Sequence, residues 1–220
     1  WAKFMARELG IQKPSEELFS IRAESLFFVS TKQRRPSLEV RYEDVINEVY
    51  TRLINTESLS NVTYDRFQSV FERADYVAET SVQFKNEELI SILTHYKQQG
   101  NRIYLLSDFY LSKKVVSQIL DFHEISHLFD DIFISCSVRE SKEKGGLYPY
   151  VLNLTHSKAS ATLMIGDNKK SDVQNAERFH IATHHLKHLS HKIRNKRNLF
   201  GSDEDDFKKV CRSIEKRCTN

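Results

Sequence analysis

The sequence is poor in the residues that make tight turns. It contains 6 glycines and 3 prolines among 220 residues, where average usage would give roughly 15 and 11. This scarcity argues against a many-turned β-sandwich or barrel and favours long helices. No apolar run approaches the roughly 18 residues of a membrane span, so we expect no membrane partner.

Cysteine and net charge are also low. The 3 cysteines, Cys136, Cys211 and Cys218, are an odd number at no metal-binding spacing, which excludes a disulfide framework and favours a reducing compartment. The first ten residues show no signal-peptide pattern, so a cytoplasmic location is predicted. The net charge of +3, from 33 basic and 30 acidic residues, gives no reason to expect a nucleic-acid partner.

The first part of the chain has the periodicity of helices. Apolar residues recur at helical spacing in four stretches between residues 15 and 100, which Gly100 ends. We therefore predict an α-helical segment over 15–100.

The pattern changes after Gly100. Short apolar runs over 102–107, 131–136 and 161–165, with a weaker one over 181–183, alternate with helical stretches. This alternation predicts an α/β fold: a Rossmann-like parallel sheet with helices on both faces, over 101–185. Residues 186–220 form a basic segment and a last helix in this prediction.

Residue types suited to chemistry follow three of the strand runs. The carboxyl ends of parallel strands share one edge of a sheet, where ligands bind, so we expect Ser107-Asp108, Lys142 and the loop Gly166–Asp172 to converge. Asp167 and Asp172 are oxygen donors that suit Mg²⁺. The simpler interpretation of Asp172 is a helix cap.

Two other candidates also have simpler interpretations. Ser107, at a strand end, can donate to a phosphate oxygen, or it is an ordinary cap. Lys142 can offset phosphoryl charge, but it can equally be a solvated loop lysine, and Lys144 lies close by.

Taken together, the three segments resemble the haloacid dehalogenase (HAD) superfamily of phosphatases, over about residues 75–185. The likeness is strongest to a branch with the motifs Ser-Asp-x-Tyr-Leu, Lys-x-x-Gly-x-Leu-Tyr and Ile-Gly-Asp-Asn-x-x-Ser-Asp. Here these are Ser107–Leu111, Lys142–Tyr148 and Ile165–Asp172. The resemblance implies a HAD-like core with a helical cap over residues 15–100.

The resemblance also implies a reaction. A Mg²⁺-dependent phosphatase would hydrolyse a small phosphate ester, such as a sugar phosphate, through a phospho-aspartate. Ser107, with Asp108, would bind the phosphoryl group, and Lys142 would offset its charge. Asp167 would hold Mg²⁺, and Asp172 would be a second ligand, direct or through water.

One motif of the family is missing. Its Asp-x-Asp-x-Thr nucleophile segment follows an opening strand, and the sequence has no such segment. Two interpretations stay open: the first strand and nucleophile lie upstream of Trp1, which we favour, or the protein is a HAD-like binding or scaffold module without catalysis.

The stretch 184–197 is rich in His, Lys and Arg. His184, His185, His188 and His191 have helical spacings that could bind a metal. No acid or cysteine supports a metal site. Together with the lysines and arginines of this stretch the histidines could contact nucleic acid, but no aromatic residue is interleaved before Phe200, so a solvated face is the preferred interpretation.

Overall fold

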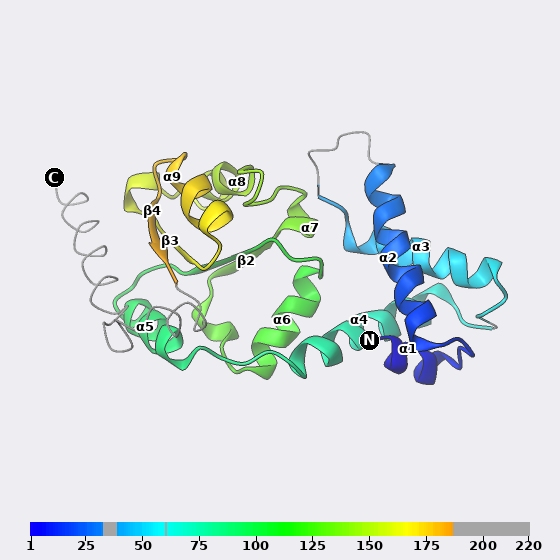
Figure 1. Ribbon diagram of the computed structural model, residues 1–220. Coiled ribbons are helices and arrows are strands. Elements are labelled where there is room, and N and C mark those ends of the chain that lie inside the picture. Colours follow the sequence, from blue (N-terminus) through cyan, green and yellow to red (C-terminus); the bar gives the residue numbers. More distant parts are fainter. Residues whose placement is uncertain (33–38, 60, 187–220) are drawn as a thin grey trace, which may run out of the picture. The chain divides into compact units, whose positions relative to one another are not determined.

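The computed structural model describes residues 1–32, 39–59 and 61–186. The chain forms two compact units, which divide after Arg139. Figure 1 shows the elements, coloured along the sequence. The predicted bounds of a cap (15–100), a core (101–185) and a C-terminal segment (186–220) stay predictions. None of the helices in these residues has the length and hydropathy to cross a bilayer.

The first unit is mostly helical. Its elements in chain order are α1 (Ala2–Leu9), α2 (Ser15–Thr31), α3 (Tyr42–Asn55), α4 (Tyr64–Thr80), α5 (Glu87–Gln98), β1 (Tyr104–Ser107), α6 (Lys113–Phe122), η1 (Ser126–Leu128), β2 (Asp131–Ile134) and α7 (Ser135–Val138). Side-chain caps begin several of these helices. Thr63 accepts from the N–H of Arg66, and Asn86 accepts from that of Leu89, as N-cap residues do.

The second unit carries the other strands. Its elements are α8 (Leu147–Leu154), η2 (Ala159–Ala161), β3 (Leu163–Gly166), η3 (Lys169–Gln174), α9 (Asn175–Glu177) and β4 (Ala182–His185). The helical stretch after β3 consists of a π-helical turn, η3, followed by the short α9.

Both sheets are parallel and small. β1 pairs with β2 in register from Tyr104–Asp131 to Ser107–Ile134, and β3 pairs with β4 from Leu163–Ala182 to Gly166–His185. The α/β class with parallel strands is therefore confirmed. Within the described ranges no further ladder exists, so each strand has a neighbour on one edge only.

The strands are less buried than their apolar sequences predict. Every residue of β1 and β3 is half-buried, although such runs are typical of strands covered on both faces. A two-stranded sheet leaves one edge of each strand without a paired neighbour, which accounts for part of this exposure.

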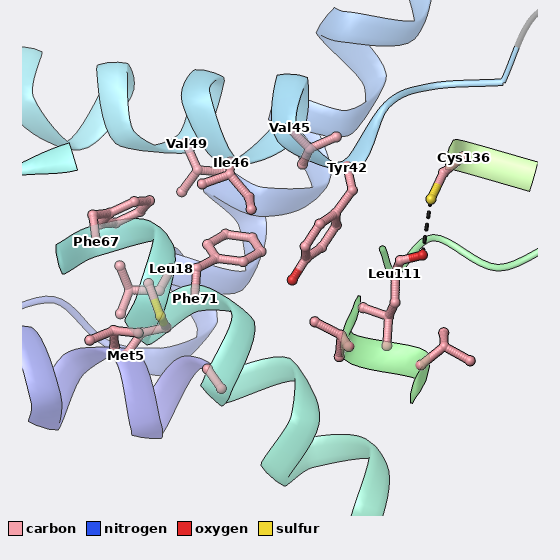
Figure 2. Close-up of a cluster of buried hydrophobic side chains, with 14 of the residues drawn as sticks. Met5, Leu18, Tyr42, Val45, Ile46, Val49, Phe67, Phe71, Leu111 and Cys136 are labelled. Carbon is pink, nitrogen blue, oxygen red and sulfur yellow. Dashed lines mark hydrogen bonds between the residues drawn. The ribbon is translucent and has the colours of Figure 1, made fainter. Parts of the chain in front are cut away.

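Helices α1–α4 and the segments around β2 share one hydrophobic core. Figure 2 shows part of it, in which the large side chains are Met5, Leu18, Ile46, Phe67, Phe71 and Leu111. Leu111 is fully buried and belongs to the loop between β1 and α6. The Ser-Asp-x-Tyr-Leu loop is therefore anchored in the same core as the helical segment.

Cys136 lies at the edge of this core and is protected from reaction. Its thiol is 4% exposed and donates to the carbonyl oxygen of Leu111 at 3.0 Å (Figure 2). Burial raises the pKa of the Cys136 thiol to about 11. The reactive thiolate is therefore scarce at neutral pH.

We expect iodoacetamide at pH 8 to alkylate Cys136 in the native protein at least about 100-fold more slowly than in urea, because thiolate is the nucleophile. Peptide mapping by mass spectrometry measures this rate. Equal rates in native and unfolded protein would contradict the buried position.

Candidate active site

The turn after β3 is organised by Asn168. Its side-chain oxygen accepts hydrogen bonds from the N–H groups of Lys170 and Ser171, each at 3.0 Å. Asn168 is therefore the N-cap of η3, the role that the simpler interpretation gave to Asp172. The carboxylate of Asp172 is left for other contacts.

Asp172 forms a buried ion pair with Lys142. The Lys142 Nζ to Asp172 Oδ1 distance is 2.6 Å, and the two side chains are 11% and 4% exposed. The second oxygen, Oδ2, accepts from the N–H of Asn168 at 3.0 Å. Lys142 is thus not the solvated loop lysine of the simpler interpretation, because it is held in the fold by a carboxylate 30 residues away.

Gly166 makes room for this carboxylate. A Cβ added to Gly166 would lie 2.6 Å from the Cβ of Asp172 and closer still to its carboxyl group. No real Cβ contact is that short, so only glycine allows the side chain of Asp172 to pack against the end of β3.

Two further side chains hold the Lys142 loop in place. Asn175 Nδ2 donates to the carbonyl oxygens of Lys142 and Glu143 at 2.9 and 2.6 Å. The buried Tyr148 hydroxyl donates to the carbonyl oxygen of Ser171 at 2.7 Å. Sequence reasoning assigned no role to Asn168 or Asn175. Tyr148 entered the sequence analysis only as the last residue of the motif Lys142–Tyr148. The signal that could have identified it is a polar hydroxyl group in a buried stretch, since such a group needs a hydrogen-bond partner.

Asp167 differs from Asp172 in its surroundings. It is exposed at the end of β3, and no described residue donates a hydrogen bond to its carboxylate. Its backbone carbonyl oxygen lies 3.0 Å from Nε2 of His185. An exposed carboxylate that keeps its lone pairs fits a Mg²⁺ ligand, since Mg²⁺ commonly takes one or two carboxylates and several waters.

Asp172 fits a direct metal ligand less well, because both of its oxygens already accept from donors of this chain. Within the described ranges no group of three or more His, Cys, Asp and Glu side chains could hold a metal alone. Asp167 is therefore the one member of the predicted pair whose present contacts leave its carboxylate available.

Ser107 and Asp108 belong to the first unit. Ser107 is the last residue of β1, is half-buried, and pairs in register with Ile134. Asp108 follows it and is exposed. Lys142 and Asp167 belong to the second unit, and the convergence of Ser107 with them stays a prediction.

The helical arrangement considered for the four histidines does not hold for the first two. His184 and His185 are neighbours in β4, and successive residues of a strand point to opposite faces. His184 is buried and His185 is half-buried. His188 and His191 lie outside the described residues.

The family follows from comparison with known families. Residues 29–185 match the model of the haloacid dehalogenase-like hydrolases, and this range includes Ser107, Lys142 and the Gly166–Asp172 loop. The chain belongs to the HAD-like hydrolase family. The resemblance drawn from three short motifs is thereby confirmed at the level of the family.

One solved structure supports the same fold, and a second is reported beside it. A structure named as that of HAD-hydrolase YfnB from Bacillus subtilis, bound to magnesium, matches with a TM-score of 0.51 and 18% identity, covering 82% of this chain and 77% of that one. L-2-haloacid dehalogenase from Xanthobacter autotrophicus matches with a TM-score of 0.49 and 11% identity, covering 95% and 80%. No curated protein matches. The HAD fold, an α/β core with a helical cap, is the architecture of this chain.

Proposed function

We propose that this HAD-like protein is a Mg²⁺-dependent phosphatase of a small phosphate ester, and that a sugar phosphate is the substrate class to test first. The observation that carries the proposal is the buried Lys142–Asp172 pair, whose carboxylate also accepts from the N–H of Asn168, together with the exposed side chain of Asp167 in the same turn. A fixed cation suits the charge of a phosphoryl group, and a carboxylate with unused lone pairs suits its metal.

The residues of the second unit would have distinct tasks. Lys142, fixed in direction by Asp172, would offset the negative charge of the phosphoryl oxygens. Asp172 would keep the ammonium group in place and reach a metal only through water, because its oxygens are engaged. Asp167 would hold the metal directly. When bound, Mg²⁺ would neutralise charge on the phosphate and orient it.

In the first unit, the roles of Ser107 and Asp108 rest on their motif alone. Ser107 would donate its hydroxyl to a phosphoryl oxygen, and Asp108 would contribute to substrate binding. Residues 15–100 would form the cap that excludes water from the reacting group.

The proposed reaction needs a carboxylate nucleophile. An aspartate oxygen would bond to phosphorus while the bond between phosphorus and the ester oxygen breaks and the alcohol leaves. Water would then release phosphate and restore the carboxylate. None of the 220 residues forms an Asp-x-Asp-x-Thr segment, so the proposed nucleophile is not among the residues described above.

The missing motif also favours a second candidate function. A chain with the Lys142–Asp172 pair but without a nucleophile would bind phosphorylated molecules and not hydrolyse them. This binding or scaffold module differs from the phosphatase in turnover alone.

An activity assay of the full natural chain, expressed from its own start codon, distinguishes the phosphatase from the binding module. With Mg²⁺ and a panel of sugar phosphates we expect release of inorganic phosphate, and at least about a 100-fold loss of kcat in Asp167→Asn, as for loss of a transition-state contact. Asp121→Asn, an exposed residue of α6, is the matched control and should keep full activity.

Two other results would change the conclusion. A folded, Mg²⁺-supplied full chain that binds sugar phosphates but releases no phosphate would support the binding module. An Asp167→Asn variant as active as the control would remove Asp167 from the reaction.

A further inference from the structure

A buried ion pair joins α2 to α4 in the first unit. Arg22 donates to both carboxylate oxygens of Asp75, at 2.5 and 3.1 Å, and their side chains are 15% and 2% exposed. The hydroxyl of Tyr42 donates to Oδ2 of Asp75 at 2.7 Å. Burial and the Asp75 carboxylate raise the pKa of Tyr42, so its hydroxyl stays protonated and can donate.

The guanidinium of Arg22 also faces three aromatic rings. Its Cζ lies 4.7 Å from the ring of Trp1, 4.9 Å from that of Phe71 and 5.4 Å from that of Tyr110. Such distances give cation–π attraction. Tyr110 is the member of this set that comes from the Ser-Asp-x-Tyr-Leu loop after β1.

Tyr110 is held from a second side as well. Its hydroxyl donates to Oε1 of Glu79 in α4. The two residues that follow are also fixed. Leu111 is buried, and its carbonyl oxygen accepts a hydrogen bond from the thiol of Cys136. The hydroxyl of Ser112 accepts from the N–H of Val115 and so caps α6.

Ser107 and Asp108 therefore lie between two anchors. On one side β1 is paired with β2, and on the other Tyr110 is packed against Arg22. The position of the Ser107 hydroxyl depends on both, since a loop of this length has few conformations between fixed ends.

A gain in folding stability does not by itself explain why the Arg22–Asp75 pair is present. Well-packed apolar residues often replace a buried ion pair at no cost, whereas a bidentate pair specifies a geometry. We propose that Arg22 is a positioning residue, which holds the ring of Tyr110 and thereby fixes Ser107 and Asp108 at the end of β1. The kinetic consequence rests on the proposed phosphatase function, but the structural one does not.

Hydrogen exchange of the 220-residue chain tests the structural part. In Tyr110→Leu and in Arg22→Met we expect amides of residues 107–112 to exchange at least about tenfold faster, because the loop opens locally more often. Tyr110→Phe keeps the ring on Arg22 and should change this rate less than about threefold. Tyr150→Leu is the matched control, since the exposed fractions are 40% for Tyr150 and 46% for Tyr110.

Fluorescence of Trp1, the only tryptophan of this chain, reports whether Arg22 has left its ring. A changed emission in Arg22→Met with unchanged exchange at 107–112 would overturn the proposal. So would equal exchange in Tyr110→Leu and Tyr110→Phe. If Arg22→Met does not fold, the Tyr110 variants still decide, because that side chain is partly exposed.

The kinetic test uses the full natural chain. We expect Tyr110→Leu to lower kcat about tenfold with KM within about threefold, since small misplacements of a group that contacts the transition state act on kcat. Tyr110→Phe should restore most of the rate. A full chain without phosphatase activity would refute the proposed function and leave the exchange result standing, whereas an active Tyr110→Leu with unchanged kcat would refute the positioning role.

Discussion

Lys142→Met should destabilise the second unit by about 3–5 kcal/mol, because it leaves the Asp172 carboxylate buried without its cation. The two side chains are 11% and 4% exposed, so water cannot replace the lost partner. Chemical unfolding followed by circular dichroism, with hydrogen exchange in β3 and β4, measures the change.

A surface pair of the same chemistry is the control. Lys170 and Glu143 lie 2.9 Å apart with both side chains 65% exposed, and Lys170→Met should cost no more than about 1 kcal/mol. The double variant Lys142→Met/Asp172→Leu removes both charges and should be more stable than Lys142→Met alone. Equal losses in the two single lysine variants would mean that the Lys142 pair is solvated.

Gly166→Ala should cost about 3 kcal/mol, because the new methyl group and the carboxylate of Asp172 claim the same space. The added Cβ would lie 2.6 Å from the Cβ of Asp172, a backbone-anchored atom that cannot move without shifting η3. We also expect the Lys142–Asp172 pair to separate, which thermal unfolding and exchange at residues 168–172 would detect together.

Gly100→Ala is the control for Gly166→Ala, because its added methyl group meets no other atom. Gly100 has φ +84°, and no atom lies within 4 Å of an added Cβ. Its substitution should cost only the roughly 1–2 kcal/mol of a left-handed backbone. A smaller loss in Gly166→Ala than in Gly100→Ala would show that the turn after β3 can rearrange freely.

Local patterns in the sequence were sufficient for the fold class and the family. Helical periodicity before Gly100 and short apolar runs after it predicted an α/β chain, and the three motifs from Ser107 to Asp172 predicted the HAD family. These features depend on residues close together in the chain, so their physical basis, periodicity and turn chemistry, can be read without coordinates.

Local patterns failed where the outcome depends on distant partners. The turn cap was assigned to Asp172 in the simpler interpretation, but the neighbouring Asn168 takes it, because Asp172 packs over Gly166 and pairs with Lys142. Short apolar runs such as residues 102–107 are typical of strands that are covered on both faces. Their half-burial reflects the neighbours that each strand has, which its own sequence does not specify.

The sequence by itself determined where most helices and strands lie and the family to which the chain belongs, and it supplied the candidate site residues. The tertiary structure alone decided which charges meet. Lys142 is paired with Asp172, while Asp167 remains exposed, and Arg22 of α2 contacts Tyr110 of the loop after β1. The physical reason is that ion pairing and burial depend on distances between residues that packing, not sequence spacing, sets.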